Sequence, residues 1–107
     1  MAEMNVRDLM GKIPGLFKPE KARGVSAIVQ CIFSGNQASD WVIRIEDQTC
    51  TVEEGLVGNP DITIKPKGED GVKLLTGRMN PVRAYMLRKV KISGDLSLGK
   101  ELVEFFK

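Results

Sequence analysis

Carboxylate side chains, among them Asp40, Asp47, Asp61 and Asp70, are the residues of this sequence suited by type to acid–base chemistry. A carboxyl group held against a reacting atom can act as a general acid or base. Each of these four, however, stands where a loop or a helix cap already explains an aspartate, because its side chain bonds nearby backbone N–H groups. The chain has no histidine, the commonest general base and metal ligand. We therefore expect no catalytic residue, no metal, no cofactor and no enzymatic activity.

Cys31 and Cys50 are the two cysteines, and both fall in stretches patterned like β-strands. A small secreted fold would normally carry more cysteines. We interpret both as reduced residues that pack in the interior, with a disulfide or a reactive thiol as the alternatives. The sequence holds no G-x-S-x-G motif, no Walker loop and no dinucleotide-binding glycine motif after a strand. Nucleophilic and nucleotide-dependent chemistry is therefore not indicated.

The charges are unevenly distributed although the net charge is only +2. The segment from Gly71 to Gly94 contains no acidic residue. Its basic residues are either a solvated helix face or a docking patch for anionic lipid headgroups. One tyrosine and one tryptophan offer little surface for stacking bases, so we expect no nucleic-acid partner. The basic residues are Lys73, Arg78, Arg83, Arg88, Lys89 and Lys91.

A chain of 107 residues corresponds to one domain, which we expect to span residues 1–107. No window approaches the roughly 18 uninterrupted apolar residues of a membrane span. The first residues have neither a basic leader nor an apolar run, so the sequence predicts no signal peptide. We expect a cytoplasmic protein.

The first half of the chain predicts helix followed by strands. Apolar residues at helical spacing predict a short amphipathic helix over residues 5–12, ended by Pro14 and Gly15, after which Leu16 and Phe17 enter the core. Pro19 begins another helical turn. Strict alternation over residues 25–34 predicts a strand. Residues 41–46 and 49–54, joined by a two-residue turn at 47–48, complete an antiparallel meander.

The second half predicts one more strand, two helices, a strand and a final helix. The strands are residues 62–64 and 91–93, and the first helix covers residues 69–76. Asn80 caps the next helix, with Val82, Tyr85 and Met86 on its inward face. Asp95 caps the last helix. Partial segregation of strands from helices favours an α+β or mixed-sheet domain, with helices over one face of one sheet. The inward stripe of the last helix is Leu98, Leu102, Phe105 and Phe106.

Apolar side chains from these helices would meet an apolar sheet face. Such a set is either an ordinary core or the lining of a pocket for a flexible apolar ligand, because methionine adapts to varied neighbours. The sheet face carries Phe33, Trp41 and Ile43. The helices offer Leu75, Met79, Met86, Leu98, Leu102 and Phe106.

Five segments, in this order, give the chain a resemblance to the sterol carrier protein type 2 domain family. They are FKPEKA at 17–22, DWVI at 40–43, NPDITI at 59–64, LTGRMNP at 75–81 and KVKISGD at 89–95. Together they span nearly the whole chain. Each segment alone would be weak evidence for the family, whereas all five in this order are specific for it.

The resemblance implies a five-stranded mixed, mostly antiparallel sheet with about five helices over one face and an apolar lipid tunnel between them. It implies binding of fatty acids, fatty acyl-CoA, sterols or phospholipids without chemical change. The tunnel wall would consist of Phe33, Trp41, Ile43, Leu75, Met79, Val82, Met86, Leu98, Leu102, Phe105 and Phe106. Arg78, Arg83, Arg88 and Lys89 would contact headgroups or an anionic membrane surface.

The chain departs from the family at Arg88, where members often have glycine, and in its short first helix. It also lacks a terminal Ser-Lys-Leu peroxisomal signal. Two other functions stay open from the residues: a protein-interaction or dimerisation module that uses the same apolar groove, and an accessory domain of a larger lipid enzyme. We expect a monomer or weak homodimer.

Overall fold

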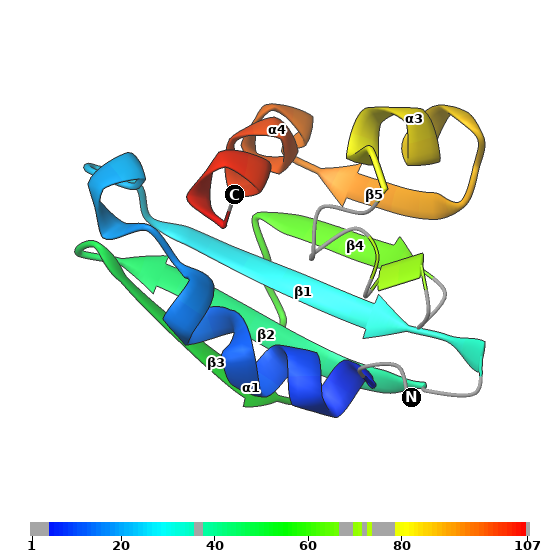
Figure 1. Ribbon diagram of the computed structural model, residues 1–107, viewed down its shortest axis with the longest axis horizontal. Helices are drawn as coiled ribbons and strands as arrows, with labels where there is room; N and C mark the ends of the chain where they lie inside the picture. Colours follow the sequence, from blue (N-terminus) through cyan, green and yellow to red (C-terminus); the bar gives the residue numbers. More distant parts are fainter. Residues whose placement is uncertain (1–4, 36–37, 67–69, 72, 74–78, 107) are drawn as a thin grey trace.

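The sheet is built outward from a central strand, β1 (Ala27–Phe33), in which every second residue, from Ala27 to Phe33, is apolar and buried. The computed structural model describes residues 5–35, 38–66, 70–71, 73 and 79–106. In it, β2 (Ser39–Glu46), β3 (Thr49–Glu54), β4 (Ile62–Pro66) and β5 (Val90–Gly94) complete the sheet. The spatial order is β3-β2-β1-β4-β5 (Figure 1).

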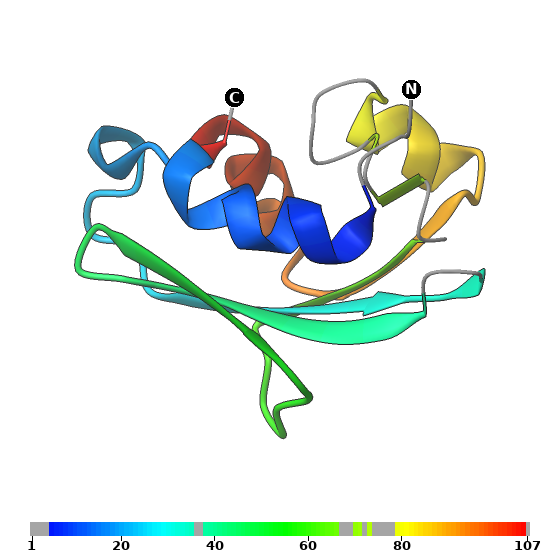
Figure 2. The ribbon, with the colours of Figure 1, turned by 60° about the horizontal axis from the view of Figure 1, so that its bottom comes forward.

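Strand directions make this a mixed, mostly antiparallel sheet. β1 pairs antiparallel with β2, and β2 with β3. β4 runs parallel to β1 and antiparallel to β5. The helices lie over one face, and the loop between β3 and β4 projects from the other (Figure 2). The predicted α+β fold class is therefore confirmed.

The strand register directs apolar residues of neighbouring strands to the helix-covered face. Cys31 is paired with Trp41, and Val29 with Ile43. On the other side of β1, Val29 is in register with Ile62. Directly paired residues share a face of the sheet, so these side chains form one continuous apolar surface.

The two-residue turn between β2 and β3 forms as predicted. Asp47 and Gln48 have φ angles of 51° and 60°, which the type I′ turn requires. Neither residue is glycine, the residue that adopts these angles most easily. Hydrogen bonds hold the turn: Gln48 Nε2 donates to the carbonyl of Pro19 at 3.0 Å, and Thr49 Oγ1 donates to that of Glu46 at 2.6 Å.

The first helix, α1 (Val6–Leu16), is longer than the sequence predicted. Asn5 caps it, its Oδ1 accepting a hydrogen bond from the backbone N–H of Asp8 at 2.7 Å. The expected stop at Pro14 and Gly15 is wrong, because the helix continues to Leu16 and forgoes the hydrogen bond that proline cannot donate. Burial of Ile13 and Phe17 on either side of this turn offsets that loss. Leu16, expected in the core, is exposed.

The remaining helices of the described residues are a 3₁₀ turn, η1 (Pro19–Lys21), and two α-helices, α3 (Pro81–Met86) and α4 (Leu96–Phe105). Three α-helices have both ends within this part of the chain, against the expected number of about five. Of the helix expected over residues 69–76, Asp70, Gly71 and Lys73 are helical, and the rest lies outside the described residues. No helix among the described residues is long and apolar enough to span a membrane.

Asp61 joins the ends of three elements. Its backbone N–H donates to the carbonyl of Ile28 at 2.8 Å, and its Oδ2 accepts from the N–H of Ile28 at 2.7 Å. Its carbonyl accepts from the N–H of Asp95 at 2.9 Å, and Asp95 Oδ1 in turn caps α4 by accepting from the N–H of Leu98. This network fixes where α4 begins relative to the sheet. The two expected caps, Asn80 for α3 and Asp95 for α4, are confirmed.

We predict that Gly94→Ala destabilises the protein by about 2–4 kcal/mol, since Gly94 has φ 98° and an added Cβ would lie 2.5 Å from the carbonyl oxygen of Asp61. Urea unfolding would measure the loss. Gly58→Ala is the matched control, because nothing lies within 4 Å of a Cβ there. Equal midpoints for the two variants would contradict this account of the Asp61 junction.

Candidate functional site

One hydrophobic cluster lies between the sheet and the helices, and it contains most of the predicted ligand-contacting residues. Phe33, Trp41 and Ile43 enter it from β1 and β2. Leu98, Leu102 and Phe105 enter it from α4, and Phe106 packs against it half-buried. The structure thus brings these seven residues together, whereas their contact with a ligand stays a prediction. Leu75 and Arg78 lie outside the described residues, and Met79 is half-buried.

Two residues of the predicted wall do not point inward. Val82 and Met86 of α3 are 52% and 75% exposed, and Tyr85 is 45% exposed. The predicted inward face of this helix is therefore wrong. Among residues 82–86 of α3, Ala84 is the buried one; it lies on the opposite side of the helix from Met86, and its small side chain lets the helix approach β5. The helical spacing was right but could not show which side of a six-residue helix faces the sheet.

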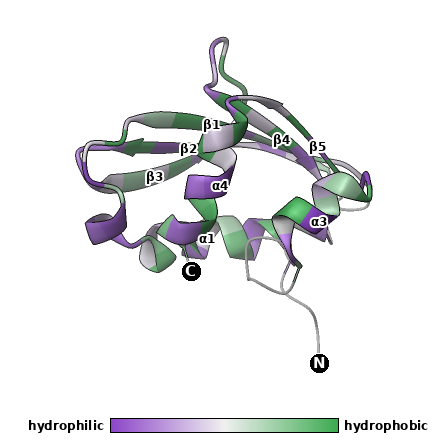
Figure 3. Ribbon diagram, turned by 90° about the horizontal axis from the view of Figure 1, so that it is seen from above, coloured by the Kyte–Doolittle hydropathy of each residue, from purple (hydrophilic) through white to green (hydrophobic). Residues whose placement is uncertain are grey.

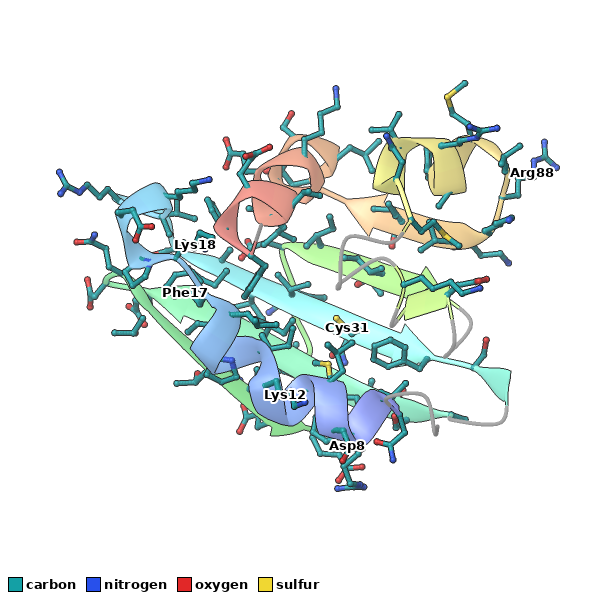
Figure 4. The ribbon with its side chains drawn as sticks, in the orientation of Figure 1. Asp8, Lys12, Phe17, Lys18, Cys31 and Arg88 are labelled. Atoms are coloured by element: carbon teal, nitrogen blue, oxygen red, sulfur yellow. The ribbon has the colours of Figure 1, made fainter. Side chains whose placement is uncertain are left out.

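Sequence reasoning missed the part that α1 plays in this site. Val6, Leu9, Met10 and Ile13 are fully buried and belong to the same cluster. Their spacing predicted an amphipathic helix but did not show that it covers the same sheet face as α4. In Figure 1, α1 lies over the β2–β3 side of the sheet, and α4 over the β4 side. Cys31, on β1, lies between them (Figure 4).

An aromatic cluster closes one end of the apolar surface. Phe17 packs edge-on against Phe105, with ring centroids 6.4 Å apart, and tilted against Phe106 at 5.8 Å. The backbone N–H of Lys18 donates to the carbonyl of Phe105 at 2.7 Å. Together these contacts attach the end of α4 to the segment that follows α1. Phe17 and Lys18 are labelled in Figure 4.

A pocket opens beside this aromatic cluster. It has a volume of about 260 Å³ and is lined by Lys21, Val25, Glu101, Glu104 and Phe105. Its volume falls just below the range of about 300–1,000 Å³ usual for ligand sites. Lys21 and Glu104 approach to 3.9 Å in a half-exposed ion pair, of a kind that contributes at most about 1 kcal/mol. The lining of the pocket therefore combines charged side chains with the apolar side chains of Val25 and Phe105.

The opposite end of the surface is closed by Trp41. Its Nε1 donates to Ser39 Oγ at 2.8 Å, and the guanidinium of Arg7 lies 5.4 Å from the ring centroid. Arg7 in turn pairs with Glu54 of β3 at 3.2 Å. A cation over an indole face is attractive, so Arg7 links the first turn of α1 to the ring of Trp41 and to β3 through two exposed, weak contacts.

A buried amide on the far face of the sheet holds the backbone at Trp41. The Nε2 of Gln30 donates to the carbonyls of Trp41 and Gly55, each at 3.0 Å. Its Oε1 accepts from the N–H of Val57 at 2.8 Å. No buried side-chain nitrogen or oxygen among the described residues lacks a partner. The polar groups of this region therefore serve the fold.

The two cysteines are free, and both pack against the hydrophobic cluster. Cys31 is buried in the hydrophobic cluster on the helix-covered face, and Cys50 is half-buried at the edge of that cluster. Burial, which disfavours the thiolate, raises the pKa of Cys31 to about 12 and that of Cys50 to about 11. The interpretation of both as reduced packing residues is confirmed. No group of residues able to hold a metal ion occurs within the described ranges.

Comparison with known proteins identifies a family and shows relatives of very different chain length. The model of the SCP-2 sterol transfer family matches residues 14–107. Hydroxysteroid dehydrogenase-like protein 2 of Xenopus tropicalis is 29% identical over 91 residues, which cover 84% of this chain and 22% of that protein. The chain thus spans about a fifth of the length of this curated relative.

Two solved structures share the fold. Palmitated SCP2L2 from Aedes aegypti has a TM-score of 0.74 and 25% identity, with 94% of this chain and 93% of that chain covered. The sec-alkylsulfatase Pisa1 from Pseudomonas sp. has a TM-score of 0.80 and 20% identity, with 96% of this chain and 16% of that chain covered. The fold therefore occurs both as nearly a whole chain and as a small part of a long one.

We predict that Cys31 resists thiol reagents in the folded protein. The thiolate is the reactive form, and at pH 9 an ordinary thiol is half ionised whereas Cys31, with a pKa of about 12, stays protonated. A disulfide reagent should label both cysteines rapidly in denaturant and Cys31 at least about a hundredfold more slowly in buffer.

The same pKa shift predicts a pH dependence of stability. The folded state keeps the thiol neutral while the unfolded state ionises, so the free energy of unfolding should fall as the pH rises above about 9. Urea midpoints between pH 8 and pH 10 would measure this fall, which should be shallower in Cys31→Ala. Rapid labelling of native Cys31 would contradict both expectations.

Proposed function

Because this chain belongs to the SCP-2 sterol transfer family, we propose that it binds a lipid with a long acyl chain between its helices and its sheet. The observation that supports this most directly is the continuous apolar surface shared by β1, β2 and α4. Such a surface fits a hydrocarbon chain and offers little to discriminate a headgroup. A fatty acid or fatty acyl-CoA fits this surface better than a ligand recognised by polar groups.

Chain length should govern affinity at such a site. Each buried methylene contributes up to about 0.8 kcal/mol before the cost of ordering the ligand. The half-exposed ionisable side chains of Lys21 and Glu104 line the pocket beside Phe105, which we take as the rim of the site. We propose that the headgroup stays at this rim and that the acyl chain lies inside.

The bound acyl chain needs a cavity, but the free protein need not contain that cavity. A dry tunnel of about 400 Å³ would cost about 10 kcal/mol, which is comparable with the whole stability of a domain. We infer that the cluster packs on itself when empty and that a ligand displaces one wall.

The end of α4 is the best candidate for the wall that moves. The start of α4 is fixed by the Asp61 and Asp95 hydrogen bonds, whereas its end is attached through the Lys18–Phe105 hydrogen bond, the phenylalanine contacts and the weak ion pair of Lys21 with Glu104. The 260 Å³ pocket lies beside this end. We propose that the acyl chain enters here, under Phe105.

The proposal includes no covalent step: the protein carries the lipid unchanged, in the cytoplasm. Incubation with a labelled fatty acid followed by extraction would test the first point, since recovery of a modified product would contradict it. Imaging of a fluorescent fusion would test the second.

We predict that palmitate, added to protein stripped of lipid, raises the melting temperature and changes the fluorescence of Trp41, the single tryptophan of the chain. A ligand at 100 times its dissociation constant stabilises by about 2.7 kcal/mol. Octanoate at the same concentration should have a much smaller effect. If neither fatty acid changes either signal, the carrier function is wrong.

We predict that Leu102→Trp abolishes this response, because the added ring fills the interior where the acyl chain would lie. The variant should still fold, at a cost of about 1–3 kcal/mol. Leu96→Trp is the matched control, because Leu96 lies on the same helix but is exposed. Isothermal titration of both variants with palmitate is the measurement. Undiminished binding by Leu102→Trp would place the ligand elsewhere.

A second candidate function is that of a lipid-presenting part of a larger enzyme. It is favoured by the small share of the Xenopus relative and of the Pseudomonas sulfatase that this chain covers. An immunoblot of the source cells would decide between the two. A band at the size of 107 residues supports a free carrier, and a much larger band supports the accessory domain.

A further inference from the structure

Helix α3 presents a group of apolar side chains to solvent. Val82, Tyr85 and Met86 share a helix face by their spacing and are 52%, 45% and 75% exposed, and Leu87 after them is 57% exposed. Contiguous exposed apolar groups on a soluble protein mark sites that contact another molecule. In Figure 3 the hydropathy colouring alternates between hydrophobic and hydrophilic along this helix.

Only positive charges are interleaved with these apolar residues. Arg83, Arg88 and Lys89 are exposed and make no ion pair with any residue that the structure describes. The sequence from Gly71 to Gly94 contains no acidic residue that could neutralise them. The apolar group therefore lies in a locally cationic surface on a protein whose net charge is only +2.

Arg88 is held in a backbone conformation that favours glycine. It ends α3 in a Schellman motif, in which its N–H donates to the carbonyl of Tyr85 at 3.1 Å and that of Lys89 to the carbonyl of Ala84 at 2.9 Å. Its φ angle is 60°. Glycine occupies this position most often because it has no Cβ to strain. Arg88 points away from the molecule at its edge (Figure 4), so its side chain gives no packing in return.

We propose that residues 82–89, namely α3 and the turn after it, dock this protein on an anionic lipid membrane. Val82, Met86 and Leu87 enter the interface between headgroups and acyl chains, with Tyr85 at headgroup level. Arg83, Arg88 and Lys89 contact lipid phosphates. A second copy of the chain fits this surface poorly, because a two-fold contact would set cations against cations. This docking does not depend on the proposed lipid ligand.

Flotation with vesicles tests the proposal. The full chain should float with vesicles of phosphatidylcholine containing phosphatidylserine and stay behind with phosphatidylcholine alone. Binding should fall steeply with salt, because exposed charges are screened over about 10 Å at 0.1 M ionic strength. Equal binding to both vesicle types at low salt would overturn the role of the cations.

The charge variants separate local from net charge. Arg83→Gln with Arg88→Gln should weaken vesicle binding about 25-fold, at about fivefold per cation near the surface. The matched control is Lys65→Gln with Lys91→Gln, a cross-strand pair on the face of the sheet opposite the helices, which removes the same charge. If the control pair weakens binding as much, only net charge acts and the proposal is wrong.

The apolar and backbone variants test insertion. Met86→Ser with Leu87→Ser should reduce binding at least tenfold, whereas Leu56→Ser, at an exposed site on the loop beyond the other face, should not. Arg88→Gly should weaken binding about fivefold without lowering the melting temperature, a pair of effects that a merely structural residue would not give. A dimer in sedimentation that Met86→Ser dissociates, with no vesicle binding by the original chain, would overturn the proposal in favour of a contact between copies. Palmitate affinity in solution should be unchanged throughout, so failure here and failure of the carrier function are distinguishable.

Discussion

The fold depends on the need to cover one face of β1. This strand has a neighbour on both sides, and its residues Ala27, Val29, Cys31 and Phe33 are all buried on the same side. Exposing such an apolar surface to water is unfavourable, and the described helices lie over that face (Figure 2). α1 lies over the β2–β3 side of the sheet and α4 over the β4 side, so neither helix covers the whole face alone. The cluster between them closes only when both ends of the chain are in place.

The same constraint explains how a packed domain could admit a guest. Because two separate helices, α1 and α4, cover the apolar face, a ligand could enter where one of them moves. The two ends of α4 are attached unequally. The start of α4 is fixed by the hydrogen bonds of Asp61 and Asp95 to neighbouring backbone, whereas its end is attached by one backbone hydrogen bond, from Lys18 to Phe105, by phenylalanine contacts and by a half-exposed ion pair. The end of α4 should therefore detach from the sheet at a lower free energy than the start, as in proteins that open locally without unfolding. The fold can remain intact while one part of its cover moves.

Local signals predicted much of this structure because local chemistry decides them. The alternation in β1, the turn at Asp47 and Gln48, and the caps at Asn80 and Asp95 each depend on neighbouring residues. The continuation of α1 past Pro14 depends instead on the burial of Ile13 and Phe17, which involves distant parts of the chain. The orientation of α3 was missed for the same reason, since Ala84 rather than Met86 faces β5. The apolar members of the site could be predicted from β1, β2 and α4, whereas the contribution of α1 required the sheet to be in place.

The buried amide of Gln30 determines where the chain could accept additional residues. Its side chain uses both protons of Nε2 and its Oε1 on three backbone groups, which ties Gly55 and Val57 to the underside of the sheet. Asp61 ties down the other end of the same connection. Between these anchors, Gly58 and Asn59 are exposed, and no hydrogen bond joins either of them to a described residue of the sheet. A peptide tag or a second domain could therefore be grafted at 58–59 without disturbing strand pairing, on the side of the molecule remote from both covers.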